Sequence, residues 1–102
     1  MIWLIFAHVI GDIALQSDWQ AQNKGKYWIV MLWHSLIWTG CICFTLNMFL
    51  GRWVNVYEIL FLLVGHYICD LWKCRTAKTF PSWHLYVDQA WHLIQCIIVY
   101  KL

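Results

Sequence analysis

Long apolar stretches separated by short polar breaks constrain the fold of this chain more than any other feature. The polar breaks lie at 16–26, 51–53 and 73–82. The apolar stretches between them lie at about 1–16, 27–50, 54–72 and 83–101. A helix that crosses a bilayer needs roughly 20 residues, which the last three stretches supply; the first is short and would tilt or thin the bilayer. We therefore predict an all-α polytopic membrane protein, a single domain over residues 1–102 built as a bundle of four transmembrane helices.

The composition supports membrane insertion. Only 12% of the residues are charged and 63% are hydrophobic, whereas soluble domains carry about 25% charged residues. So few charges cannot cover the surface of a soluble domain, and a chain this apolar is not disordered. A net charge of +2 without a basic cluster argues against a nucleic-acid partner. The expected partners are membrane lipids, and the sequence leaves the number of subunits open.

The basic residues predict which side of the membrane each break faces. The first and third breaks hold most of them: Lys24, Lys26, Lys73, Arg75 and Lys78. The other side holds Arg52 and Lys101. Because cytoplasmic loops carry an excess of Lys and Arg, we expect the loops near 17–26 and 73–82 to be cytoplasmic and both termini to face outward.

Ionisable residues inside the apolar stretches form a repeated pattern. Three pairs have i, i+4 spacing and one histidine stands alone: His8 with Asp12, His66 with Asp70, Asp88 with His92, and His34. Residues at this spacing share a helix face. At 1.5 Å of rise per residue, all of them fall within roughly 15 Å of the cytoplasmic boundary. Ionisable groups in a bilayer are costly and generally functional, so the sequence predicts a polar site at one level of the bundle.

Four imidazoles and three carboxylates at one depth are typical of a metal site. Imidazole and carboxylate ligands suit zinc, iron or manganese, and one zinc ion takes about four ligands. Seven ligands therefore predict two divalent metals, most simply two zinc ions, with a carboxylate between them. The predicted metal ligands are His8, Asp12, His34, His66, Asp70, Asp88 and His92.

Other interpretations of these residues stay open. The set could instead form a proton or ion path, or a purely structural polar core. A lone intramembrane histidine commonly makes a helix-to-helix hydrogen bond, and we prefer that role for His84. Lys73 either extends toward the interface or holds an anionic substrate group. We expect Gln16, Gln89 and Gln95 to support the ligands or to pack, not to bind metal.

These blocks resemble a family of small uncharacterised membrane proteins of bacteria and their phages. The resemblance rests on an early His-x-x-x-Asp followed by Gln, a single His, a His-x-x-x-Asp-x-x-Lys and a late Asp-Gln-x-x-His. In this chain the blocks begin at His8, His34, His66 and Asp88. The resemblance implies a bacterial inner-membrane protein. A more distant similarity to LexA-regulated, membrane-bound metal-dependent hydrolases implies hydrolytic activity, although other sequence elements of that group are absent here.

The expected function is an intramembrane di-metal hydrolase that acts on a lipid or lipid-linked (phospho)ester near the cytoplasmic leaflet. Activated water would be the nucleophile. An aspartate among Asp12, Asp70 and Asp88 would be the general base, and Lys73 would hold the head group. The alternatives are a metal-binding membrane protein without catalysis, as in phage superinfection exclusion or lysis, an ion or proton carrier, and a di-iron oxidase or hydroxylase.

Overall fold

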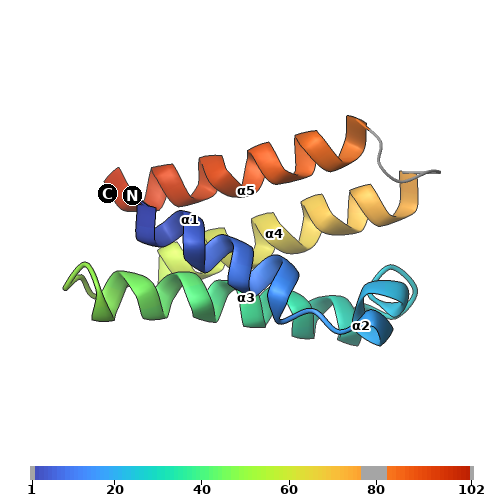
Figure 1. Ribbon diagram of the computed structural model, residues 1–102, viewed down its shortest axis with the longest axis horizontal. Helices are drawn as coiled ribbons and strands as arrows, with labels where there is room; N and C mark the ends of the chain where they lie inside the picture. Colours follow the sequence, from blue (N-terminus) through green and yellow to red (C-terminus); the bar gives the residue numbers. More distant parts are fainter. Residues whose placement is uncertain (1, 77–82, 102) are drawn as a thin grey trace.

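The computed structural model describes residues 2–76 and 83–101, and within them every regular element is a helix. In chain order these are α1 (Ile2–Val9), the π-helix η1 (Ile10–Ala14), α2 (Asp18–Asn23), α3 (Trp28–Met48), α4 (Val56–Thr76) and α5 (Trp83–Lys101) (Figure 1). The predicted all-α class is confirmed. The three long predicted helices also begin and end within a few residues of the observed α3, α4 and α5.

The helices form an elongated bundle of 40 × 25 × 23 Å. Helix α3 packs against α4 and α4 packs against α5, while α1 and η1 lie against α3 and α1 also contacts α5 (Figure 1). Both chain ends lie at one end of the bundle, and the short α2 lies at the other, beside the start of α3.

The first apolar stretch does not continue as one α-helix to residue 16. At η1 it widens into a π-helix, in which the Leu15 amide donates to the Ile10 carbonyl, five residues back, at 2.9 Å. A Cβ added at Gly11 would lie 3.0 Å from the Cα of Trp38. The bare glycine therefore lets η1 approach the backbone of α3 closely.

The predicted first polar break also contains regular structure. Helix α2 starts after Ser17, whose hydroxyl accepts a hydrogen bond from the Gln20 amide at 3.1 Å, as an N-cap residue does. The turn after α2 returns the chain to α3 and passes close to α4, because a Cβ on Gly25 would lie 2.8 Å from the Cβ of Cys74.

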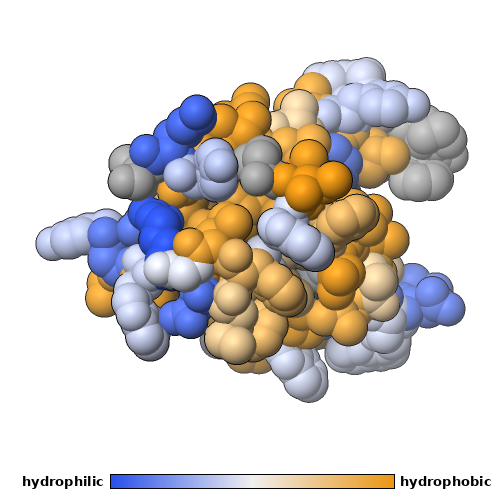
Figure 2. Space-filling model, turned by 60° about the vertical axis from the view of Figure 1, so that its left-hand side comes forward, coloured by the Kyte–Doolittle hydropathy of each residue, from blue (hydrophilic) through white to orange (hydrophobic). Residues whose placement is uncertain are grey.

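Many polar side chains are buried in this bundle, and many large apolar side chains lie on its surface. Among the described residues, more polar and charged side chains than hydrophobic ones are buried. Large apolar side chains cover the outside, for example Phe44 on α3, Ile68 on α4 and Ile98 on α5. Figure 2 shows this hydrophobic surface over much of one face. In water such a surface would be unfavourable, because apolar area exposed to water opposes folding.

By length and apolar composition, one helix of the described residues, α3, could cross a membrane; Ile2–Ala14 is apolar but shorter. Helices α4 and α5 are less apolar on average because each carries buried polar residues, such as Asp70 and Asp88. Of the two loops predicted to be cytoplasmic, residues 77–82 lie outside the described residues.

The buried interior divides into two halves. The half near the chain ends is apolar and is built from Leu4, Ala7, Trp38, Ile42, Leu46, Leu62, Cys96 and Val99. The half nearer α2 holds the buried histidines and aspartates that the sequence pattern singles out. An ion pair of 2.6 Å between Arg52 and Glu58 joins the loop after α3 to the start of α4 at the apolar end.

Candidate metal centre

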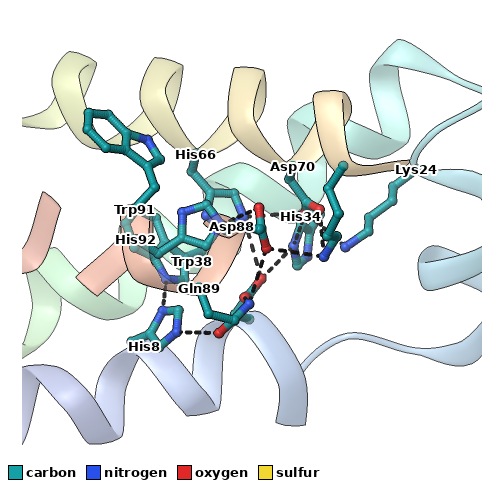
Figure 3. A network of polar contacts seen from close by, with 12 residues as sticks. His8, Lys24, His34, Trp38, His66, Asp70, Asp88, Gln89, Trp91 and His92 are labelled. Carbon is teal, nitrogen blue, oxygen red and sulfur yellow. Dashed lines mark hydrogen bonds and ion pairs between the residues drawn. The ribbon is translucent and has the colours of Figure 1, made fainter. Parts of the chain in front are cut away.

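Four buried side chains form the first group of potential metal ligands. Asp12 comes from η1, His34 from α3, and His66 and Asp70 from α4. One ligand atom of each lies within 4.8 Å of the others, and no side chain of the group is more than 4% exposed. The structure thus brings together residues that are up to 58 positions apart in the chain, as Figure 3 shows for the labelled members.

The distances in this group match those of a metal-ligand set. His34 Nε2 lies 3.0 Å from Asp12 Oδ1 and also 3.0 Å from Asp70 Oδ2. His66 Nε2 lies 3.6 Å from the same two oxygens. Zinc–ligand bonds of about 2.0–2.2 Å in a tetrahedron separate neighbouring ligand atoms by about 3.3–3.6 Å. A single divalent cation between these four atoms would therefore need little rearrangement.

The contacts of His66 also suit a metal ligand. Its side chain is fully buried, yet neither ring nitrogen has a hydrogen-bond partner. Leaving a buried polar atom unpaired costs about 1–3 kcal/mol. Since Nε2 faces the carboxylates of Asp12 and Asp70, a metal ion bound there would satisfy it.

The second group of potential ligands consists of Asp12, Asp88 and His92, all buried. Asp88 Oδ1 and His92 Nε2 lie 3.0 Å apart, but neither atom takes part in a hydrogen bond. Two close polar atoms with no hydrogen bond between them are suited to bind one cation together. Asp12 belongs to both groups, so it could contribute to a metal ion in either of them. A group of three protein ligands would resemble catalytic zinc sites, where water or substrate supplies the fourth ligand.

Two glutamines hold members of the second group in place. The Gln89 amide donates to Asp12 Oδ2 at 2.9 Å and to Asp88 Oδ2 at 3.2 Å. Gln95 Nε2 donates to the Phe61 carbonyl at 3.0 Å, and its Oε1 lies 3.4 Å from Nδ1 of His92. Both glutamines thus contact members of this group, as partners that orient metal ligands do, whereas the buried Oε1 of Gln16 has no hydrogen-bond partner.

His8 lies beside the two groups and belongs to neither of them. Its Nε2 lies 2.8 Å from Gln89 Oε1, and its Nδ1 accepts a hydrogen bond from Trp38 Nε1 at 2.9 Å. Both ring nitrogens are therefore already occupied. The π-helix that begins at Ile10 adds a residue to the turn after His8, so the simple i, i+4 alignment with Asp12 does not hold.

Two lysines neutralise part of the carboxylate charge. Lys73 Nζ lies 3.2 Å from Asp70 Oδ1 and 3.2 Å from Asp88 Oδ2. Lys24 Nζ, only 4% exposed as a residue, lies 2.8 Å from Asp70 Oδ2 (Figure 3). The centre thus combines three carboxylates with two ammonium groups, and the remaining negative charge favours a cation.

Lys24 and Trp38 are the members of the centre that the sequence pattern did not indicate. In the sequence, Lys24 is one of the basic residues of the first polar break, and no helical spacing connects it with Asp70. Trp38 lies four residues after His34 on the same helix, which is a usable signal. His84, predicted not to be a ligand, lies outside both groups, with its ring centroid 3.9 Å from that of Trp83 and 5.1 Å from that of Trp72.

A comparison with known protein families matches residues 1–102 to the family described as "Protein of unknown function (DUF3307)". The chain belongs to the DUF3307 family. The predicted membership of an uncharacterised family is thereby confirmed. No curated protein and no solved structure matches this DUF3307 chain.

Within this DUF3307 protein, the buried groups of His and Asp could hold a metal ion. Their chemistry is consistent: imidazole and carboxylate donors suit zinc, iron and manganese. Of the seven predicted ligands, the structure gathers all except His8 into two groups that share Asp12. Two ammonium groups, those of Lys24 and Lys73, lie beside these groups.

Proposed function

We propose that this DUF3307 protein is an intramembrane di-metal hydrolase that cleaves a lipid or lipid-linked phosphoester near the cytoplasmic leaflet. The observation that carries the proposal is the sharing of Asp12 between a group of four ligands and a group of three. A group of four ligands and a group of three that share the Asp12 carboxylate would suit two metal ions that bind and activate a substrate together. Zinc is the metal we propose, with iron or manganese as alternatives.

A four-span arrangement is supported by the outer faces of the helices. Helices α4 and α5 expose Ile59, Val64, Ile68, Ile94 and Ile98, and they bury their polar residues inside the bundle. The bundle is 40 Å long, and a bilayer with its headgroup regions is about 40–45 Å thick. The first crossing, Ile2–Ala14, is short, and the bilayer would have to thin around it.

The position of the centre supports a substrate from the cytoplasmic leaflet. The centre lies in the half of the bundle nearer α2, and basic residues gather at this end: Lys24, Lys26, Lys73 and Arg75. An excess of Lys and Arg favours the cytoplasmic side. A lipid head group in that leaflet would meet the three-ligand group without crossing the apolar half of the bundle.

The residues have separable roles in hydrolysis. Bound metal ions supply an activated water and stabilise charge on the phosphoryl oxygens. The water oxygen attacks phosphorus, the bond from phosphorus to the alcohol oxygen breaks, and the alcohol leaves with a proton. We assign proton transfer to an aspartate among Asp12, Asp70 and Asp88, all of which lie at the centre. Lys73 and Lys24 would hold the anionic oxygens of the head group, since both ammonium groups already face the carboxylates at the centre.

An ion or proton path is less well supported by the packing. Beyond Trp38 the interior is mostly apolar: Ile42, Leu46 and Leu62 are fully buried, and the buried Glu58 is paired with Arg52. A translocated ion would need polar partners across this half, because unsatisfied charge in an apolar interior is strongly unfavourable.

The test is hydrolysis of phospholipid by the metal-loaded protein. We expect liposomes of phosphatidylglycerol and phosphatidic acid to release product, and His66→Ala to slow release by at least about 100-fold, because even outer-shell partners of a metal contribute about 10–100-fold. His84→Ala is the matched control and should keep the rate. Fully loaded protein that hydrolyses neither lipid faster than His66→Ala would contradict the proposal and leave a metal-binding protein without this activity.

A further inference from the structure

An apolar groove opens on the outer surface between α4 and α5. Its volume is about 510 Å³, and it is lined by Gly65, Ile68, Cys69, Trp72, Val87 and Trp91. The Trp91 ring nitrogen donates to the Gly65 carbonyl at 3.2 Å, which ties the two walls together. Ligand sites of proteins measure about 300–1,000 Å³ and are mostly apolar, so the groove has the size and chemistry of a binding site.

The groove lies beside the candidate metal centre, because its lining residues are sequence neighbours of residues of the centre on the same two helices. Cys69 in one wall of the groove precedes Asp70, and Val87 in the other wall precedes Asp88. Trp72, in the same wall as Cys69, precedes Lys73, whose Nζ lies 3.2 Å from Asp88 Oδ2. A molecule in the groove would therefore have one end at the three-ligand group, beside an ammonium group, and the rest among apolar side chains.

A second, smaller groove lies elsewhere on the bundle and differs in its neighbours. It has a volume of about 270 Å³ and is lined by Trp3, Phe6, Ala7, Ile10, Thr45 and Phe49. No ionisable side chain of the described residues lines it. Of these two grooves, only the one between α4 and α5 has lining residues that are next in sequence to members of the two ligand groups.

We propose that the groove between α4 and α5 holds an acyl chain of an anionic lipid whose phosphate head group lies at the metal centre. The inference rests on the proposed function for the reaction, but the binding it describes can occur without turnover. The apolar lining selects the chain, and the ammonium groups of Lys73 and Lys24 select a negatively charged head group. Because the groove opens on the apolar exterior, the lipid would enter sideways from the bilayer.

The experiment measures binding of dodecyl phosphate by native mass spectrometry in a short ethylene-oxide detergent. Val87→Trp fills the groove. Ile94→Trp is the control, because Val87 and Ile94 are both 45% exposed on α5 but Ile94 does not line the groove. We expect one dodecyl phosphate per chain for the wild type and for Ile94→Trp. Val87→Trp should bind it at least about tenfold more weakly, since several buried methylenes are displaced.

Further variants protect the test against a folding defect. Ile68→Trp fills the same groove from α4 and should repeat the result of Val87→Trp, whereas Val64→Trp, outside the groove lining on the same helix, should not. Lys73→Met should weaken binding of both dodecyl phosphate and inorganic phosphate. Val87→Trp and Ile68→Trp should weaken binding of dodecyl phosphate but not binding of inorganic phosphate.

Two outcomes would overturn the inference. One is equal binding of dodecyl phosphate by Val87→Trp, Ile68→Trp and their controls. The other is a wild-type dimer that Val87→Trp converts to a monomer, because a second copy of the chain would then fill the groove. The metal content of the same samples separates the two proposals. If the metal-loaded protein binds dodecyl phosphate in the groove but hydrolyses no lipid, the proposed hydrolase is wrong and the proposed lipid-binding groove stands.

Discussion

Two neighbouring histidines, His8 and His92, have different contacts although their ring centroids lie 5.8 Å apart. His92 Nε2 faces Asp88 Oδ1 without a hydrogen bond, whereas both nitrogens of His8 are hydrogen-bonded. We expect His92→Ala to lose one of two bound metal ions and His8→Ala to keep both. Metal analysis of each purified variant checks this. Loss of an ion from His8→Ala would show that His8 rearranges into a ligand.

Lys24 forms a buried ion pair with Asp70 at a distance of 2.8 Å. Breaking a buried ion pair by removing one partner costs about 3–5 kcal/mol, so Lys24→Met should strongly destabilise the metal-free protein. Added zinc should recover most of the loss, because a cation at the centre would again pair with Asp70.

Lys26→Met is the control for this prediction, since Lys26 is exposed; its effect should stay within about 0.5 kcal/mol. Thermal unfolding in detergent, with and without zinc, measures both variants. Equal unfolding temperatures for metal-free Lys24→Met and Lys26→Met would argue that the ion pair contributes nothing.

The sequence predicted helix-borne ligands better than the other residues of the centre. His66 and Asp70 share a helix face by spacing alone, and the structure places both in one group. Lys24 lies in a turn, and only the path of the chain brings it to Asp70, 46 positions away. No periodic pattern in a sequence records such a contact, because loop geometry depends on the packed bundle.

At the scale of elements, the approach of η1 to α3 depends on Gly11. A Cβ there would meet the Trp38 backbone at 3.0 Å and the Cys41 Cβ at 3.2 Å. We expect Gly11→Ala to cost about 1–3 kcal/mol, as overpacking does, and to weaken metal binding by displacing Asp12.

Gly40 provides the matched control on α3, since a Cβ there has nothing within 4 Å. Gly40→Ala should be neutral or stabilising by about 0.5–1 kcal/mol, because alanine restricts the unfolded chain more than glycine does. Chemical unfolding in detergent compares the two variants. A Gly11→Ala protein as stable as Gly40→Ala would show that η1 can move away from α3 without cost.

Element boundaries followed from composition where the helices are long and apolar. The last stretch, 83–101, coincides with α5, whereas α4 continues to Thr76, four residues past the predicted end. The π-helix η1 and the short α2 were not predictable from an apolar run and a polar break. The choice between α- and π-type hydrogen bonds depends on how a helix packs, as the contact of Gly11 with α3 illustrates.

At the scale of the whole molecule, the buried charges and the apolar exterior predict a membrane topology. A reporter fused after Thr76 should lie in the cytoplasm, and the same reporter fused after Met48 should lie outside, because the basic residues gather at the α2 end. Each fusion serves as the control for the other. Both reporters on one side would mean that α4 does not cross, and the four-span arrangement would be wrong.

The most direct test of the central proposal is the metal content of the protein, purified in detergent without chelators and measured by mass spectrometry. The double variant His66→Ala, Asp70→Ala removes two ligands of the four-ligand group, and His84→Ala is the control. We predict about two zinc, iron or manganese ions per chain in the wild type and the control, as a two-metal centre requires, and their loss in the double variant. A metal-replete wild type that binds none would contradict the centre and the hydrolase with it.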